Sequence, residues 1–198
     1  MCCRYYVEAT PYFIELGELA QENTMRNKAH HNEGNVLTVG EISPGNQVPV
    51  IASSKAGKKI AFLMFWGFRS RTGSLIINAR SETAAEKPTF APCLRSRRIV
   101  LPAEAFFEWR RETGEKYRFT VPGLSTFYLG GLYRREGEET RFVILTRAAN
   151  GDMAPVHHRM PLILGPEAVR AYLTREDSAR GLLTGEAPRL YAEACRSS

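Results

Sequence analysis

The second residue of this sequence has the most distinctive chemistry in the chain. Cys2 directly follows Met1, and its small side chain permits removal of the initiator methionine. A cysteine at the N-terminus carries an α-amine and a thiol with reference pKa values of about 7.7–8.0 and about 8.5, so both groups are partly nucleophilic near neutral pH. Such a 1,2-aminothiol condenses with an aldehyde, because the amine forms an imine and the thiolate then closes a five-membered thiazolidine ring. On position alone Cys2 is more simply a small second residue, so the interpretation depends on the rest of the chain.

Polar groups that suit anion recognition follow an apolar run at positions 75–83. Strand alternation would place Asn78, Arg80 and Glu82 on one face and Ile77 on the other. An amide, a guanidinium and a carboxylate side by side favour phosphate binding over packing. An ordinary ion pair at the end of a strand is the alternative interpretation.

A carboxylate between aromatic residues is the first candidate for acid–base chemistry. Glu108 lies between Phe107 and Trp109 in an otherwise apolar segment, positions 100–109. Burial disfavours the charged form of a carboxylate and so allows it to accept and donate a proton near neutral pH. Glu104 is the competing candidate in a less apolar setting, and an outward-facing Glu108 on an edge strand is the alternative.

Paired histidines supply the second candidate. His157 and His158 precede an arginine and an apolar segment, and histidine is the side chain best suited to moving protons near neutral pH. A single histidine is more often structural. Neighbours in an extended chain point to opposite sides, so neither this pair nor His30-His31 can chelate a metal ion together. The sequence has no phosphate-binding glycine loop and no zinc-finger spacing, and we expect neither a metal nor a cofactor.

The elements that must position these groups are predicted to be mainly strands. Apolar segments separated by turn residues predict strands at positions 48–52, 60–66, 98–109, 117–121, 126–133 and 141–146. Helices are predicted at 11–25 and 166–173, with a last short helix at 188–195. Positions 26–35 are polar and are expected to form a loop. Many short strands with a few helices indicate a β-rich α+β domain.

Composition fits one folded domain with an anionic partner. The chain has 198 residues, of which 43% are hydrophobic and 10% aromatic. Its longest apolar run, at 60–66, is too short to cross a bilayer, and positions 1–20 lack a signal-peptide pattern, so we expect a cytoplasmic protein whose four cysteines are reduced. The net charge of +6 favours a polyanion without establishing one.

Short motifs in a fixed order connect the candidates with a known family. They are Cys-x-Arg at 2–4, Asn-Ala-Arg-x-Glu-Thr at 78–83, Phe-Glu-Trp at 107–109 and His-His-Arg-Met-Pro at 157–161. Together they resemble the SRAP (SOS response associated peptidase) family, whose members are abasic-site processing proteins. The resemblance also covers Ser43-Pro44-Gly45 and Trp66-Gly67.

The resemblance implies a fold and a partner. It implies mostly antiparallel strands in a barrel-like core with a few flanking helices. The protein would be a monomer that binds single-stranded DNA containing abasic sites, without a metal or a membrane. It would be cytoplasmic, and nucleoid-associated when bound to DNA. The resemblance covers roughly positions 2–175 and leaves 176–198 as a C-terminal extension of one domain spanning 1–198.

The resemblance also implies roles for individual residues. Cys2 attacks the aldehyde of a ring-opened abasic site and makes a thiazolidine DNA–protein cross-link, Asn78 positions the sugar-derived part, and Glu108 and His157 move protons. Self-removal of Met1 and an abasic-site lyase activity belong to the same expectation. The implied DNA contacts, with the arginines on phosphates, are Arg4, Pro44, Trp66, Arg80, Thr146 and Arg159.

This sequence departs from the family pattern at three places, and other functions compete with the one implied. Cys3 replaces the usual glycine, Glu104 lies in an Ala-Glu-Ala that replaces Ala-Asp-Gly, and arginines at 69 and 71 replace tryptophans of some relatives. One alternative is an N-terminal-nucleophile cysteine peptidase or amidohydrolase that does not act on DNA, although the amidohydrolase needs a larger sandwich than this short chain provides. Another is a peptidase limited to releasing Met1, and a third is a DNA-binding module without catalysis.

Overall fold

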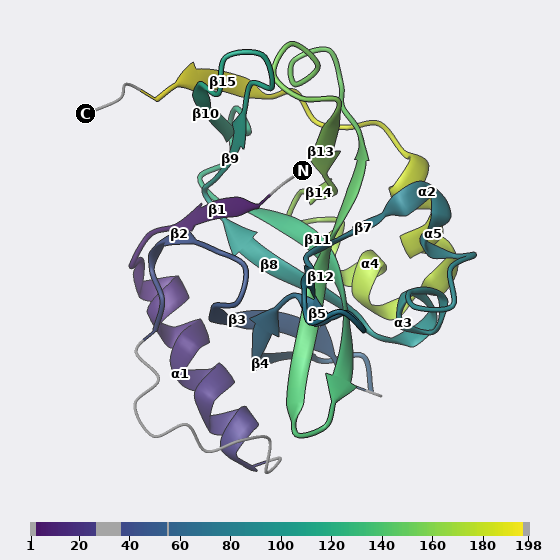
Figure 1. Cartoon of the computed structure of the whole chain (residues 1–198). Helices are drawn as coiled ribbons and strands as arrows, with labels where there is room; N and C mark the ends of the chain where they lie inside the picture. Colours follow the sequence, from purple (N-terminus) through teal and green to yellow (C-terminus); the bar gives the residue numbers. More distant parts are fainter. Residues whose placement is uncertain (1–2, 27–36, 55, 196–198) are drawn as a thin grey trace.

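A closed barrel of five strands forms the centre of the molecule (Figure 1). The computed structural model describes residues 3–26, 37–54 and 56–195, so Cys2 and positions 27–35 of the predicted loop lie outside the described residues. The barrel strands are β3 (Gln47–Ser53), β4 (Lys59–Trp66), β8 (Arg98–Ala103), β11 (Phe127–Glu136) and β12 (Glu139–Ala148). They pair in the order β12–β4–β3–β8–β11, and β11 pairs with β12 to close the ring. Only the β12–β4 pairing within this ring is parallel.

Short strands extend the barrel beside the candidate residues. β7 (Asn78–Arg80) runs parallel to β12, with Asn78 opposite Ile144. β13 (Arg159–Pro161) pairs with β12 further along, where Arg159 lies opposite Ala148. β14 (Ile163–Leu164) pairs with β11. β12 therefore brings together two of the sequence motifs that are far apart along the chain.

A second sheet carries the start of the chain. Its strands are β1 (Arg4–Val7), β2 (Gly40–Ile42), β9 (Ala105–Trp109), β10 (Lys116–Thr120) and β15 (Tyr191–Ala194). They pair antiparallel in the order β15–β10–β9–β1–β2. Only Glu104 separates β8 from β9, so one run of chain passes from the barrel into this sheet. Arg4 lies opposite Phe107, which brings the beginning of β1 close to Glu108.

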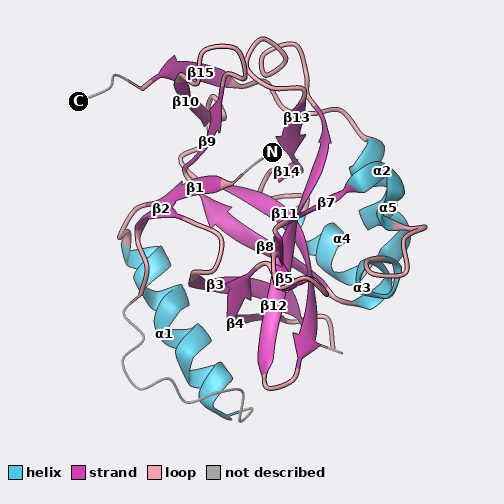
Figure 2. Ribbon diagram, in the orientation of Figure 1, coloured by secondary structure: helices cyan, strands magenta, loops and turns pink. Residues whose placement is uncertain are grey.

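Helices flank the strands on two sides (Figure 2). On one side α1 (Pro11–Arg26) packs against β3 and β4 and buries Phe13, Leu16 and Ala20. On the other side lie α2 (Ser81–Ala84), α3 (Ala91–Ser96), α4 (Val169–Thr174) and α5 (Glu176–Thr184). Among the helices of the described residues, none is long and apolar enough to span a membrane.

The β-rich α+β class predicted from the sequence is confirmed, and one predicted element is wrong. The helix at 11–25 and the six strand segments agree with the structure within a few residues, although 98–109 divides at Glu104 and the helix expected from 166 begins at Val169. The helix predicted at 188–195 is not formed, because 191–194 are the strand β15. All four residues of β15 are exposed, so backbone pairing with β10 outweighs their local preference.

A buried tryptophan joins the barrel to the second sheet. Trp66 at the end of β4 is completely buried, and its ring centroid lies 5.6 Å from that of Tyr5 in β1 and 6.2 Å from that of Phe142 in β12. Its indole Nε1 donates a 2.9 Å hydrogen bond to the carbonyl oxygen of Ile77, immediately before β7. Buried aromatic rings contribute strongly to packing, so Trp66 sets β1 and β7 relative to the barrel.

Gly67 turns the chain out of the barrel into a small hairpin. Its φ of +112° favours glycine, and an added Cβ would lie 3.0 Å from the Cβ of Leu75. The amide of Gly67 donates to the carbonyl of Phe142 at 2.7 Å, and its carbonyl accepts from Nη1 of Arg141 at 2.9 Å. The hairpin that follows consists of β5 (Phe68–Arg69) and β6 (Leu75–Ile76).

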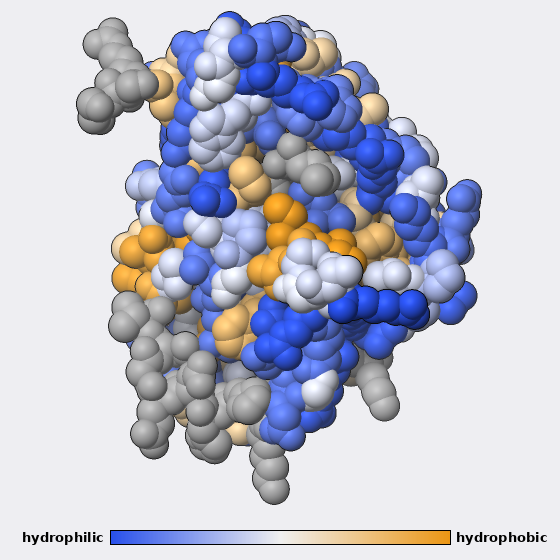
Figure 3. Space-filling model, in the orientation of Figure 1, coloured by the Kyte–Doolittle hydropathy of each residue, from blue (hydrophilic) through white to orange (hydrophobic). Residues whose placement is uncertain are grey.

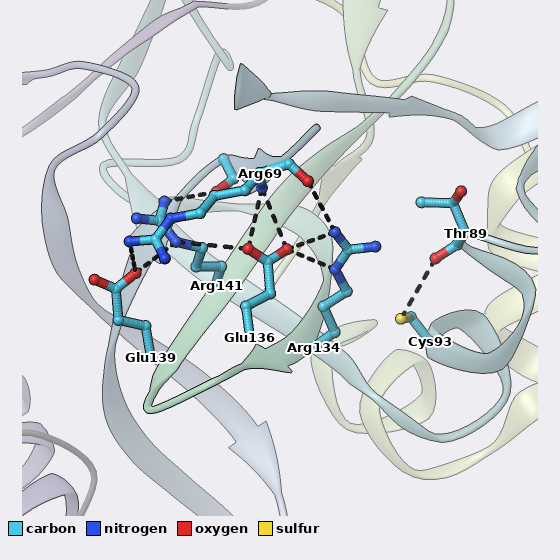
Figure 4. A network of polar contacts seen from close by, with 8 residues as sticks. Arg69, Thr89, Cys93, Arg134, Glu136, Glu139 and Arg141 are labelled. Carbon is cyan, nitrogen blue, oxygen red and sulfur yellow. Dashed lines mark hydrogen bonds and ion pairs between the residues drawn. The ribbon is translucent and has the colours of Figure 1, made fainter. Parts of the chain in front are cut away.

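A network of arginines and glutamates attaches this hairpin to β11 and β12 (Figure 4). The carboxylate of Glu136 accepts hydrogen bonds from the amide of Arg69 at 3.1 and 3.2 Å and from Nε of Arg134 at 2.6 Å. Glu139 joins the guanidinium groups of Arg69 and Arg141 at 2.8 and 2.7 Å. Because the side chain of Glu136 is only 13% exposed, its contacts are poorly replaced by water.

We expect Glu136→Gln to lower the free energy of unfolding by about 1–3 kcal/mol, because a neutral amide leaves the partly buried arginines with weaker partners. Urea unfolding followed by intrinsic fluorescence measures the change. Glu138→Gln is the matched control at an exposed position in the same turn, and it should shift stability by less than about 0.5 kcal/mol. Equal stabilities of the two variants would show that the network does not hold the hairpin.

Candidate active site

The start of β1 lies beside the carboxylate of Glu108. β1 pairs with β9 through Arg4 and Phe107, so the residues just outside this pair, Cys3 and Glu108, are brought close together. The pKa of the Cys3 thiol is raised, first by burial and then by the negative charge of Glu108. The residue that follows Cys2 is therefore within electrostatic range of this carboxylate, whereas Cys2 itself lies outside the described residues.

The two glutamates that compete in the sequence have different environments. Glu108 is 4% exposed within β9. Glu104 lies between β8 and β9, where its carboxylate accepts a hydrogen bond from the amide of Glu8 at 2.9 Å and from the hydroxyl of Thr126 at 3.3 Å. Burial also raises the pKa of Glu104. Glu104 thus connects strands of the fold, and Glu108 is the carboxylate beside the start of β1.

The side-chain amide of Asn78 makes one long hydrogen-bond contact and leaves its oxygen without a partner among the described residues. Its Nδ2 lies 3.5 Å from the carbonyl oxygen of Ile144, which it can reach because β7 pairs with β12. Its Oδ1 is buried and has no hydrogen-bond partner among the described residues. Most buried polar atoms in proteins are hydrogen-bonded, and an orphaned one costs about 1–3 kcal/mol. This oxygen is available to a hydrogen-bond donor of a bound molecule.

His157 is held by the main chain of Arg159. The histidine is 8% exposed, and its Nδ1 lies 3.0 Å from the amide nitrogen and 3.2 Å from the carbonyl oxygen of Arg159. In the neutral ring Nδ1 accepts from the Arg159 amide, so the proton is carried by Nε2. The main chain of Arg159 therefore holds the ring of His157 in place.

Glu82 pairs with the side chain of Arg159. Its two carboxylate oxygens accept from Nη1 and Nη2 of Arg159 at 2.7 and 2.8 Å, and Oε1 also accepts from the amide of Ala148 at 3.1 Å. The hydrogen bonds from Arg159 are the main cause that lowers the pKa of Glu82 to about 2. The face expected to hold Asn78, Arg80 and Glu82 is interrupted, because the strand ends at Arg80 and Glu82 lies in α2.

The residues expected to contact DNA differ in accessibility. Arg80 is exposed, Pro44 is partly exposed in the turn before β3, and the Arg4 side chain is 34% exposed. Trp66 is completely buried and Thr146 is 1% exposed, so neither side chain presents a surface to DNA, contrary to the expectation. The rings of Tyr5 and Phe142 pack against Trp66, and the guanidinium of Arg159 lies 3.4 Å from the hydroxyl of Thr146.

The remaining predicted contact, Arg159, is mostly covered. Its side chain is 11% exposed, with Nη2 also donating to the carbonyl oxygen of Thr146 at 2.7 Å. Arg159 is therefore part of the support around His157, in addition to any role toward a ligand.

Segments from distant parts of the sequence converge at the upper half of Figure 1, around the start of β1. The pKa of His158 is lowered, first by desolvation and then by the charges of His157 and of Arg111 in the β9–β10 turn. The interaction with Arg111 indicates that the loop 149–158, which carries both histidines and is called the histidine loop below, lies near the hairpin that carries Glu108. The same half of the molecule is mainly hydrophilic in the space-filling view (Figure 3). Within the described ranges, no group of three or more His, Cys, Asp or Glu side chains could hold a metal ion.

The C-terminal segment contacts both the histidine loop and the second sheet. Asn150 in the histidine loop donates to the carbonyl of Pro188 at 2.8 Å, and Asp152 accepts from the amide of Leu190 at 2.9 Å and from Nε of Arg189 at 3.1 Å. The next residues form β15, which pairs with β10. Sequence reasoning missed these contacts. The Asn-Gly-Asp run at 150–152 indicates a turn, but its partners at 188–190 have no local signature.

Comparisons with known proteins identify the family. The SOS response associated peptidase (SRAP) family matches residues 1–193. The abasic site processing protein YedK of Escherichia coli is 31% identical over 162 residues, which cover 78% of this chain and 70% of that protein. The abasic site processing protein YoqW of Bacillus subtilis is 29% identical over 159 residues, which cover 74% of this chain and 71% of that protein. The chain therefore belongs to the SRAP family.

A solved structure supports the fold independently. An X-ray structure of a protein from Bordetella bronchiseptica aligns with a TM-score of 0.73 over 99% of this chain and 100% of that chain. The two sequences are 24% identical over the alignment, so the likeness concerns the fold alone.

Glu108→Gln should lower the pKa of Cys3, because the removal of a neighbouring negative charge favours the thiolate. At pH 8 we expect iodoacetamide to alkylate Cys3 several-fold faster in this variant than in its parent. All proteins compared carry Cys2→Ala, so that Cys3 is the only thiol in the N-terminal peptide that mass spectrometry follows. Glu104→Gln is the control and should leave the rate unchanged. Equal rates in the two glutamine variants would mean that Glu108 does not lie beside Cys3.

Proposed function

We propose that this protein processes abasic sites in single-stranded DNA by forming a covalent cross-link through Cys2. Membership of the SRAP family supports abasic-site processing, because the relatives YedK and YoqW carry that name. The single structural observation that carries the proposal is the pairing of Arg4 in β1 with Phe107 in β9. It brings the residue next to Cys2 into the range of a buried carboxylate, which is the type of group that this chemistry requires.

The proposed reaction begins at the α-amine of Cys2 after Met1 has been removed. The amine nitrogen adds to the aldehyde carbon of the ring-opened abasic site, and the resulting carbinolamine loses one water to give an imine. The thiol sulfur then adds to the imine carbon while its proton passes to the nitrogen, which closes the thiazolidine ring. One C–N bond and one C–S bond replace the C=O bond, whose oxygen leaves as water, so no oxidant or reductant is required.

Glu108 and His157 are proposed to move the protons of this sequence. The amine and the thiol must each lose a proton to become nucleophilic, and the carbinolamine hydroxyl must gain one to leave as water. Glu108 is buried near the start of β1, where it can accept and return a proton. The amide of Arg159 donates to Nδ1 of His157 and fixes the ring, so Nε2 is the nitrogen that we assign to proton transfer.

Asn78 and the arginines are proposed to hold the DNA. The buried Oδ1 of Asn78 suits a hydroxyl group of the ring-opened sugar, which would satisfy the orphaned acceptor. Arg80 follows on the same strand and is exposed, so it can bind a neighbouring phosphate. Contacts of this kind bind the DNA backbone and do not read the base sequence.

Cys2→Ala should abolish the heat-stable adduct with uracil-glycosylase-treated single-stranded DNA, measured as a shifted band on a denaturing gel. Alanine keeps the α-amine, so borohydride should still trap an imine, but no ring can close. Protein shown by intact mass to retain Met1 should fail in the same way, because its Cys2 nitrogen is part of a peptide bond. Cys3→Ala is the control and should still cross-link. A heat-stable band from Cys2→Ala would contradict the thiazolidine mechanism.

Glu108→Gln should slow cross-linking by about 10²–10⁴-fold, because the amide keeps the shape of the side chain but cannot transfer a proton. Its affinity for undamaged single-stranded DNA should change little. Rates come from single-turnover gels at saturating DNA, which separate chemistry from binding. Glu104→Gln is the matched control, expected to lose some thermal stability and to keep its rate at 25 °C. If Glu104→Gln were the slow variant, the roles of the two glutamates would be reversed.

A further inference from the structure

We infer that Glu82 is a positioning residue of this site, which holds Arg159 and through it orients the ring of His157 for proton transfer. The inference rests on the function proposed above. Glu82 belongs to the motif that contains Asn78 and Arg80, but none of the proposed chemical steps uses it. The contacts of Glu82 indicate a role that differs from those proposed for Asn78 and Arg80.

Glu82 binds both residues of the strand pair that closes the histidine loop. Ala148 at the end of β12 lies opposite Arg159 at the start of β13, and the loop between them carries His157. The carboxylate of Glu82 accepts from the amide of Ala148 at 3.1 Å and from both Nη atoms of Arg159 at 2.7 and 2.8 Å. One side chain from α2 therefore holds the two ends of this loop together.

The support continues from Arg159 to the imidazole ring through the main chain. The amide of Arg159 lies 3.0 Å from Nδ1 of His157, so it selects the neutral form whose proton is on Nε2. The carbonyl oxygen of Arg159 lies 3.2 Å from the same nitrogen. A shift of Arg159 would remove both of these contacts with Nδ1, and its amide would then no longer favour the Nε2 tautomer.

Electrostatics argue that Glu82 does not serve DNA affinity or proton transfer. Its pKa of about 2, caused mainly by the hydrogen bonds from Arg159, keeps the carboxylate charged throughout the neutral range. Its side chain is 46% exposed, so this negative charge opposes phosphates that approach Arg159 or Arg80. We therefore assign Glu82 a geometric role, because it stays charged near neutral pH and its charge is expected to oppose DNA phosphates.

Glu82→Gln is the decisive variant, because it should change rate and affinity in opposite directions. We expect the cross-linking rate at saturating DNA to fall about tenfold, as expected when a proton-transfer group is misplaced. Affinity for undamaged single-stranded DNA at low salt should rise about two- to fivefold, because one negative charge near the phosphates is lost. Glu86→Gln, an exposed position with the same charge change, is the control and should keep the parent rate.

The ring nitrogens of His157 provide a readout that does not depend on DNA. Long-range ¹H–¹⁵N spectra of the free protein should show an unprotonated Nδ1 and a protonated Nε2, with the signals assigned by comparison with His157→Gln. Glu82→Gln should give a mixture of tautomers, and the amide of Arg159 should exchange faster with solvent. Glu86→Gln should retain the parent spectrum. An unchanged ring spectrum in Glu82→Gln would overturn the inference.

A double-mutant cycle tests the path through Arg159. Arg159→Lys keeps the charge but loses the two-point contact with Glu82, so it should slow the reaction by a similar factor. Glu82→Gln added to Arg159→Lys should then slow it less than twofold further. Additive losses would show that Glu82 does not act through Arg159.

The experiments also separate this inference from the proposed function. If the parent protein forms no adduct, the proposed function fails. If the parent reacts and the Glu82→Gln variant reacts at the same rate, only this inference is refuted.

Discussion

A single strand, β12, determines where most of the candidate groups lie. It pairs with β4 and β11 in the barrel and with β7 and β13 beyond it, so that Asn78, Trp66 and Arg159 are all placed relative to one strand. Side chains alternate along a strand, and a slip of one residue in any of these pairings would turn the paired residue to the opposite face. Because β12 is paired on both sides in a closed barrel, its register is constrained from several directions. The rigidity of the candidate site derives from this constraint.

The second sheet depends on the barrel through the contact between Tyr5 and Trp66. Glu108 and the start of β1 lie in this sheet, whereas Asn78 and His157 depend on β12. The packing of the two aromatic rings, and the hydrogen bond from Trp66 to Ile77, give the two groups of residues a common reference. Trp66 was expected at the DNA surface, but it is completely buried and supports residues of the candidate site.

Burial and secondary structure could be predicted from the sequence where they depend on neighbouring residues. Glu108 between two aromatic residues was expected to be buried, and it is 4% exposed. The β-rich class followed from short apolar segments separated by turns. The pairing of Glu82 with Arg159 could not be predicted, because 77 positions separate them and only the barrel brings them together. The burial of Thr146 and the strand β15 were missed for the same reason, since each depends on a distant strand and not on nearby residues.

The second sheet also has a consequence for how the chain folds. Two of its strand pairs join residues that are far apart in the sequence, Arg4 with Phe107 and Arg118 with Glu193. Contacts between residues so far apart require the closure of long loops, which costs conformational entropy before any contact is gained and slows folding. Adjacent hairpins such as β3–β4 and β11–β12 close much shorter loops and can form earlier. The sheet that holds Glu108 is therefore expected to be completed late, after the barrel has provided a surface on which Tyr5 can pack.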